Sequence, residues 1–193
     1  MYRTKTKKKL PVILEDNELK RLMAIPNKRY YTGLRNKAII TLMANTGLRV
    51  SELVNLKTNH IDLNLGKLRV VCGKYKRDRD LKIPKKTLEL LKAWNKRRLK
   101  GEYFFNTYKN TKIQRRYLNA MLRRYTRRAG IKKHITPHTL RHTYSTHHYR
   151  QFKDLETLRR ILGHSDISTT QIYITLANLE VEASMDNYRE IVA

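Results

Sequence analysis

Cysteine is nearly absent from this chain, which has a single one, Cys72, among 193 residues. One thiol excludes an internal disulfide and any zinc site built from several cysteines, and it is typical of a reducing, cytosolic setting. Long apolar runs are also missing, because no stretch approaches the roughly 18 residues of a membrane span. The basic residues 1–9 lead into no apolar signal core, so the pattern does not indicate a secreted protein.

Acidic residues are scarce as well. Against 43 Lys and Arg stand 16 Asp and Glu, which gives a formal net charge of +27. Residues 1–150 hold 39 of the cations and 9 of the acids, whereas residues 151–193 hold 4 and 7. Such a charge on so short a chain points to a polyanion, most simply nucleic acid. We therefore expect residues 1–150 to face nucleic acid and the acidic end to face protein, the alternative being a merely solvated acidic face.

Apolar residues recur at helical spacing through most of the chain. The pattern predicts helical segments at 16–24, about 34–47, 50–56, 85–98, 114–129, 137–150, 154–163 and 167–173. A last amphipathic helix is expected within 178–193, where Val181, Met185, Tyr188 and Val192 share one face. The chain is therefore predicted to be mostly helical.

The hydrophobic period changes between residues 68 and 83. Residues 68–72 and 80–83 are predicted to be two antiparallel strands, joined by a cation-rich hairpin connection at 73–78. Pro84 ends the second strand. Residues 103–105, a Tyr followed by two Phe, are predicted to form a short buried strand. The expected fold class is α+β, mainly α, with a small antiparallel sheet.

Four segments carry residues of chemical interest: 46–53, 73–79, 138–142 and 162–173. They read TGLRVSEL, GKYKRDR, HTLRH and LGHSDISTTQIY. Each one alone has an ordinary explanation, such as a surface arginine, a turn lysine, a helix-capping histidine or a core tyrosine.

In order and spacing, the four segments resemble those of the tyrosine recombinase family, which contains DNA-cutting integrases and Xer-type resolvases. Segment 162–173 is similar to the family's nucleophile segment nearly letter for letter, and 137–142 resembles its His-x-x-Arg box. The resemblance runs from residue 10 to residue 173 and on into the tail. It implies site-specific recombination, in which DNA strands are cleaved and rejoined through a 3′-phosphotyrosine.

The resemblance also implies a division of the chain. Residues 10–177 would be a tyrosine recombinase catalytic domain, residues 1–9 the basic end of a linker, and residues 178–193 an exchange helix. The N-terminal core-binding domain of most family members is expected to be absent. The chain would then be either a natural minimal recombinase or an isolated catalytic domain.

Matching by position implies a catalytic set: Arg49, Lys74, His138, Arg141, His164 and Tyr173, with Glu52 as a supporting acid. The two arginines would clamp the phosphate, Tyr173 would attack it, and Lys74 would protonate the leaving oxygen. His138 would act as base or hydrogen-bond partner, and His164 would hydrogen-bond the phosphate. Tyr75 stands where glycine is common, which leaves Lys76 as an alternative to Lys74, although the family register favours Lys74.

Metal binding is the rival interpretation of the histidines. His138 and His142 lie at i and i+4 of an expected helix, but the His-Glu-x-x-His pattern and a nearby carboxylate pair are missing. We therefore expect neither a metal nor another cofactor.

The expected DNA contacts are Lys7, Lys8, Lys9, Lys76, Arg77, Arg115, Arg116, Arg123 and Arg127. Helix 114–129 resembles the family helix that enters the major groove. Arg115 and Arg116 at its start could reach base edges, whereas the later arginines would hold phosphates. A basic face that is merely solvated is the alternative.

The implied partner is double-stranded DNA in the cytoplasm, where the protein would be nucleoid-associated and make no membrane contact. The resemblance implies a homotetramer on DNA, joined through the C-terminal helix, and the charge of +27 favours a monomer in free solution. Two other functions share part of the pattern: a type IB topoisomerase, and a non-catalytic DNA-binding accessory protein. An exchange helix argues against the first and the intact residue set against the second.

Overall fold

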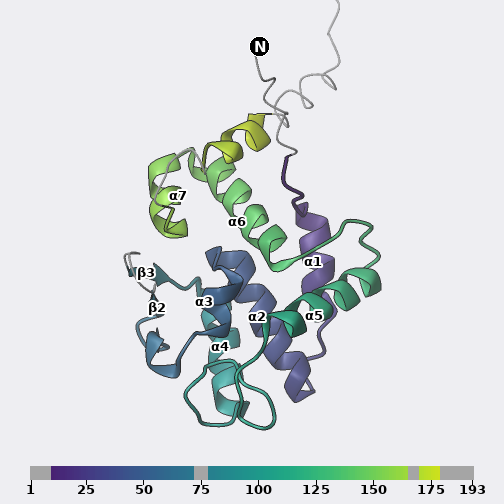
Figure 1. Ribbon diagram of the computed structural model, residues 1–193, viewed down its shortest axis with the longest axis vertical. Helices are drawn as coiled ribbons and strands as arrows, with labels where there is room; N and C mark the ends of the chain where they lie inside the picture. The colour runs from purple at the N-terminus through teal and green to yellow at the C-terminus, as the bar shows by residue number, and fades with distance from the viewer. Residues whose placement is uncertain (1–9, 72–77, 165–169, 179–193) are drawn as a thin grey trace, which may run out of the picture.

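The structure is a computed structural model, which describes residues 10–71, 78–164 and 170–178 as a helical molecule with one small sheet (Figure 1). Its helices are α1 (Asp16–Ala24), α2 (Tyr31–Thr46), α3 (Val50–Val54), η1 (Thr58–His60), α4 (Lys85–Arg97), α5 (Arg115–Arg128), α6 (Pro137–Phe152) and α7 (Leu155–Leu162). Residues 170–178 are also helical. In these described parts, no helix is long and apolar enough to cross a membrane.

These helices confirm the predicted ones, with ends that differ by a few residues. Gly47 ends α2 and Gly163 ends α7, both with positive φ. Pro137 begins α6, and the Asp154 side chain caps α7 by accepting the Thr157 N–H at 2.9 Å. The helix predicted within 178–193 lies outside the described residues, apart from its first residue.

The sheet has three antiparallel strands in the order β1 (Ile61–Asp62), β2 (Lys67–Val70) and β3 (Arg79–Lys82). In β2 and β3, Leu68 faces Leu81 and both are buried, while Lys67 and Lys82 beside them are exposed. This alternation confirms the two predicted strands. Strand β1 was not predicted. Residues 73–77 of the predicted hairpin connection, and Cys72 before them, lie outside the described part of the chain.

The predicted strand at residues 103–105 is wrong. Tyr103 makes only an isolated bridge to Lys57, and Phe104 and Phe105 belong to no strand. Phe104 and Phe105 are both buried, at 1% and 2% exposure, so the burial predicted for this segment is present although the strand is not. The indole of Trp94 donates to the Phe104 carbonyl at 3.0 Å, so this segment is held by the core instead.

Helix α2 forms the centre of the core and packs against both α4 and α6 (Figure 1). Its buried residues point in all directions, as expected for a helix surrounded by others. At its end, Gly47 has φ +63°, and a Cβ there would lie 2.5 Å from the Tyr144 ring. The tight turn that only glycine fits places Arg49 directly after the central helix.

A buried polar network joins α2 to α5. Arg35, 3% exposed, donates to the Asn106 carbonyl at 2.9 Å and to the Tyr117 hydroxyl at 2.6 Å. The amide of Asn36 accepts from Tyr117 and donates to the Tyr125 hydroxyl. Because Tyr117 and Tyr125 lie about two turns apart on α5, the network fixes the rotation of that helix, and with it the direction of its outward arginines.

Candidate active site

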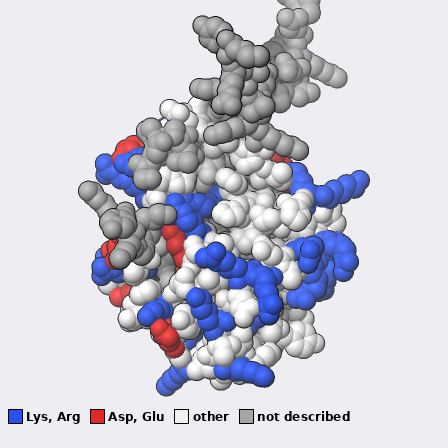
Figure 2. Space-filling model, in the orientation of Figure 1, with Lys and Arg blue, Asp and Glu red and all other residues white. Residues whose placement is uncertain are grey.

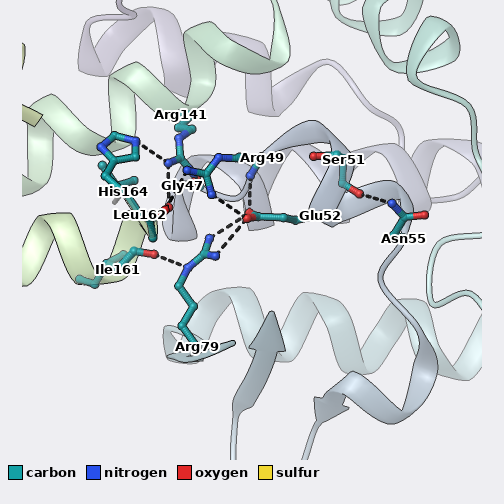
Figure 3. A network of polar contacts seen from close by, with 11 residues as sticks. Gly47, Arg49, Ser51, Glu52, Asn55, Arg79, Arg141, Ile161, Leu162 and His164 are labelled. Carbon is teal, nitrogen blue, oxygen red and sulfur yellow. Dashed lines mark hydrogen bonds and ion pairs between the residues drawn. The ribbon is translucent and has the colours of Figure 1, made fainter. Parts of the chain in front are cut away.

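Three arginines meet at the C-terminal end of α7 (Figure 3). They come from β3, α6 and the residue before α3, and each donates to one of three consecutive carbonyls. The pairs are Arg79 Nε with Ile161 O at 2.6 Å, Arg141 Nη2 with Leu162 O at 2.8 Å, and Arg49 Nη2 with Gly163 O at 3.0 Å. The last carbonyls of a helix lack intrahelical partners and form the negative end of its dipole, so they attract cations.

Glu52 lies between two of these arginines. Arg49 caps α3, and its backbone N–H and Nη1 donate to the two Glu52 oxygens at 2.8 and 3.0 Å. Arg79 donates through both Nη atoms to the same carboxylate, at 3.0 and 2.9 Å. Burial opposes ionisation of Glu52, but the hydrogen bonds and charge of Arg79, helped by Arg49, hold its pKa below the usual value. Glu52 is therefore a carboxylate at neutral pH.

Arg141 is the most buried of the three, at 5% exposure. Besides Leu162 O, it donates to the carbonyl of Gly47 at 2.7 Å, which ties α6 to the end of α2. Burial, and next the charge of Arg49, lower its pKa to about 10, so it remains charged at neutral pH. The structure thus brings the two predicted clamp arginines to one place.

His164 contacts Arg141 directly. Its Nε2 lies 2.8 Å from Arg141 Nη2 and its Nδ1 lies 3.0 Å from the Thr170 hydroxyl. A guanidinium can only donate, so Nε2 accepts and the ring proton is on Nδ1. Burial, followed by the charge of Arg141, lowers the His164 pKa to about 4, which keeps the ring neutral. Both ring nitrogens of His164 are therefore hydrogen-bonded to groups of the protein.

Tyr173 lies in the helical segment 170–178 and is 1% exposed. Its hydroxyl lies 3.1 Å from Nδ1 of His142 on α6. Burial raises the pKa of the phenol, and it also lowers the pKa of His142 together with the charges of His138 and Arg141. Both groups are therefore neutral at pH 7, and they share one hydrogen bond.

His138 occupies an exposed position one turn before His142 on α6. The sequence predicted His138 as the partner of Tyr173, whereas His142 takes that place in the structure. Sequence reasoning treated His142 only as a rival metal ligand. Within residues 10–71, 78–164 and 170–178, no group of three or more His, Cys, Asp or Glu is placed to hold a metal ion.

Arg79 and Thr170 were also missed. Both belong to segments that the sequence marked as unusual, 73–79 and 162–173. Their partners, however, depend on contacts between residues far apart in the chain, such as Arg79 with Ile161. Other predicted residues lie outside the described part of the chain: Lys7, Lys8, Lys9, Lys74, Lys76 and Arg77.

Helix α5 presents the predicted DNA-binding arginines. Those within the described residues are all exposed: Arg115, Arg116, Arg123 and Arg127. The first turn of α5 holds Arg115 and Arg116 and no acid. Two cations therefore lie at the positive end of the helix dipole, and a bound anion would reduce the repulsion between these positive charges. Lys and Arg side chains are spread widely over the face in Figure 2, and acids are few there.

Comparison with known proteins agrees with this geometry. The profile of the Phage integrase family matches residues 13–180. The chain is 37% identical over 176 residues to the tyrosine recombinase XerD of Ralstonia nicotianae, covering 88% of this chain and 57% of that protein. It is 37% identical over 192 residues to the tyrosine recombinase XerA of Pyrococcus furiosus, covering 96% and 65%. The chain thus spans less than two thirds of the length of either relative.

Solved structures share the fold. A crystal structure of XerA recombinase superposes with a TM-score of 0.81 at 30% identity, covering 97% of this chain and 68% of that one. XerH site-specific recombinase in a post-cleavage complex with palindromic difH substrate gives 0.80 at 26% identity, covering 93% and 54%. The predicted fold, a tyrosine recombinase catalytic domain with a small antiparallel sheet, is confirmed.

Proposed function

Because the chain belongs to the phage integrase family, we propose that it is a site-specific DNA recombinase, which breaks and rejoins DNA strands through a 3′-phosphotyrosine. One observation carries the proposal: Arg49, Arg141 and His164 converge at the end of α7, and Tyr173 is held beside the same helix as Arg141. The named relatives are tyrosine recombinases, so neither topoisomerase activity nor a non-catalytic accessory role is favoured.

The buried Arg141 and the half-buried Arg49 suit a phosphodiester. Each guanidinium presents a fixed fork of donors, and the charge that develops on the non-bridging oxygens during attack strengthens those bonds. The carbonyls at the end of α7 hold Arg49 and Arg141 in place before DNA arrives. This preorganisation means that little rearrangement of the clamp is needed at the moment of reaction.

The nucleophile must lose a proton and must reach the DNA. Burial raises the pKa of Tyr173 above its usual value, so a base has to remove the proton as the phenol attacks. We assign that role to His138, with His142 as the group that holds the phenol in the DNA-free chain. Since Tyr173 is 1% exposed, the phenol has to become accessible when DNA binds.

The other chemical steps follow from the bond being exchanged. We assign the proton for the leaving 5′ oxygen to Lys74, with Lys76 as the alternative. One phosphoester replaces another, so the energy of the broken linkage is retained and the reaction runs without ATP or a metal. A 5′ hydroxyl then attacks the phosphotyrosine and releases Tyr173.

DNA binding is assigned to the basic surface around α5. Two similar structures, XerH with difH substrate and the Tn1549 transposon integrase with a circular intermediate DNA, are complexes with DNA. The arginines of α5, which the polar network on α2 holds outward, are exposed for the same role here. A double-stranded DNA partner would place the protein on the nucleoid in the cytoplasm.

Assembly is part of the proposal. Strand exchange needs two DNA sites, so we propose a homotetramer on DNA joined through residues 178–193. In free solution the net charge of +27 opposes association and favours a monomer. Phosphates offset that charge when the protomers meet on DNA.

The decisive experiment traps the covalent intermediate. The protein is incubated with a pool of nicked, end-labelled duplexes of randomised sequence, and adducts that survive denaturing gels are recovered and sequenced. We expect an adduct with the intact chain, in the presence of EDTA, and none with Tyr173→Phe, which removes only the attacking oxygen. Tyr173→Phe should still bind the enriched duplex, which shows that it is folded. An adduct with that variant, or activity that depends on a divalent ion, would contradict the assignment.

A further inference from the structure

Arg79 has the most complete set of contacts of the three arginines at the end of α7, and no role in the chemistry has been given to it. It is the first residue of β3, and its side chain reaches away from the sheet toward α3 and α7 (Figure 3). Its side chain is 9% exposed and that of Glu52 is 8% exposed, so the pair is buried. A buried ion pair needs nearly ideal geometry to be tolerated.

That geometry is present. Nη1 and Nη2 of Arg79 donate to the two oxygens of Glu52 at 3.0 and 2.9 Å, a parallel two-bond arrangement, and Nε donates to Ile161 O at 2.6 Å. All three nitrogens of the guanidinium are thereby bound to protein groups. Arg79 is therefore poorly suited to hold a phosphate and well suited to hold the residues that do.

A second observation shows how closely Arg79 fits. A Cβ on Gly163 would lie 2.9 Å from Nη1 and 3.3 Å from Cζ of Arg79. Gly163 also has φ +62°, so this position excludes larger residues both by conformation and by space. The guanidinium thus packs closely against the turn that leads from α7 to His164.

The contacts form one chain of support. Arg79 holds the Glu52 carboxylate, and Glu52 in turn binds the backbone N–H and Nη1 of Arg49. Because Arg79 supplies two bonds to that carboxylate, its positive charge balances Glu52 and leaves the charge of Arg49 available for a phosphate. On its other side Arg79 fixes the end of α7, to which Arg49 and Arg141 also bind.

We propose that Arg79 is a positioning residue for DNA strand cleavage, which orients Arg49 through Glu52 and joins strand β3 to the carbonyl end of α7. This inference rests on the proposed recombinase function. It assigns Arg79 no contact with the reacting atoms. Its effect is on the direction and charge of the phosphate clamp.

The test compares Arg79→Lys with Arg69→Lys. Lysine keeps the charge but lacks the fork, and Arg69, on the neighbouring strand β2, forms an exposed pair with Asp78 and serves as a matched control. Single-turnover adduct formation is measured on the enriched duplex with an ordinary phosphodiester, and on the same duplex with a neutral methylphosphonate at the cleaved linkage. Thermal melting of each variant is recorded alongside.

On the phosphodiester, Arg79→Lys should cleave about tenfold to a hundredfold more slowly, because a clamp misplaced by about 1 Å loses that much. On the methylphosphonate the difference in rate between Arg79→Lys and the unaltered chain should shrink markedly. The neutral linkage lacks the negative charge that Arg49 would otherwise neutralise. Arg69→Lys should match the unaltered chain on both substrates. Should Arg79→Lys fail to fold, the paired variant Arg79→Met with Glu52→Gln removes both charges and should show the same substrate dependence.

Two results would overturn the inference: cleavage by Arg79→Lys at the unaltered rate, or an equal loss on both substrates. Failure of the proposed function looks different. In that case the unaltered chain itself forms no adduct, or the adduct persists in Tyr173→Phe. An adduct with the unaltered chain is thus the condition under which the Arg79 comparison is made.

Discussion

At the scale of single residues, the site is a set of cations held by neutral and acidic groups of the protein itself. Arg141 and Arg79 are both nearly buried, and each is satisfied by backbone carbonyls or by Glu52. Without such partners, removing these charges from water would cost several kcal/mol per ion. The carbonyls of residues 161–163 therefore hold Arg79, Arg141 and Arg49 together at the end of α7.

His164 makes stability depend on pH. Its pKa is about 4 in the folded chain, below the ordinary value of 6.5. Between these values the unfolded chain binds a proton that the folded chain does not, so the free energy of unfolding falls as the pH is lowered from about 6.5 to 4. His164→Gln should flatten this fall, which urea denaturation at pH 7.5 and pH 5 would measure.

Exposed His134 provides the control. His134→Gln should leave the difference between the two pH values close to that of the unaltered chain. His142 also has a lowered pKa through burial, so part of the pH dependence should survive in His164→Gln. An undiminished pH dependence in His164→Gln would contradict the half-buried, neutral state of His164.

At the scale of elements, the sequence predicted what depends on local pattern. The stripe of Leu118, Met121, Leu122 and Tyr125 predicted α5 within one residue at either end, because helical periodicity is a property of neighbours. Residues 103–105 were misjudged, since an aromatic run indicates burial and does not say whether a partner strand exists. The two-residue strand β1 is too short to give any pattern.

In the candidate site, too, the residues found from local sequence pattern differ from those that depend on long-range contacts. The four segments identified Arg49, Arg141, His164 and Tyr173, because their spacing resembles a family. The contact of Arg79 with Glu52 joins residues 27 apart, and that with Ile161 joins residues 82 apart. No periodicity or spacing encodes such pairs, which form only when β3, α3 and α7 pack together.

Helix α5 should show two kinds of DNA contact. Arg123→Ala with Arg127→Ala removes two expected phosphate contacts, so the slope of log K against log[salt] should become shallower by about 2. Arg115→Ala with Arg116→Ala should instead relax the choice among sequences in the enriched pool, because these side chains stand at the helix start. Binding titrations at several salt concentrations measure both effects.

Lys92→Ala, a change at an exposed position of α4, serves as the control. It should change the slope of log K against log[salt] by no more than about 1 and leave the sequence preference unchanged. If the paired change at Arg123 and Arg127 leaves the slope unaltered, the basic face of α5 is merely solvated. If the change at Arg115 and Arg116 weakens all sequences equally, these residues contact phosphates and do not contact bases.

At the scale of the whole molecule, the net charge differs in sign between two parts of the sequence. Residues 1–150 carry a net charge of +30 and residues 151–193 a net charge of −3, because the first hold 39 cations and 9 acids and the second 4 and 7. The basic part suits DNA and the acidic part suits a basic protein surface. A second copy of this chain offers such a surface, which is consistent with assembly on DNA.

The last prediction concerns that assembly. Val181, Met185, Tyr188 and Val192 share one face if residues 178–193 form a helix, and an apolar face has to be buried. Deleting residues 178–193 should leave binding to a single DNA site intact, because the arginines of α5 and the site at α7 are outside the deleted part. Complexes in which the protein joins two DNA sites should disappear in native gels, since the proposed contact between protomers is removed. Sedimentation should show both proteins as monomers without DNA, because like charges oppose association. Paired-site complexes that form equally well with the shortened protein would mean that the helix folds back on its own domain and that assembly depends on another surface.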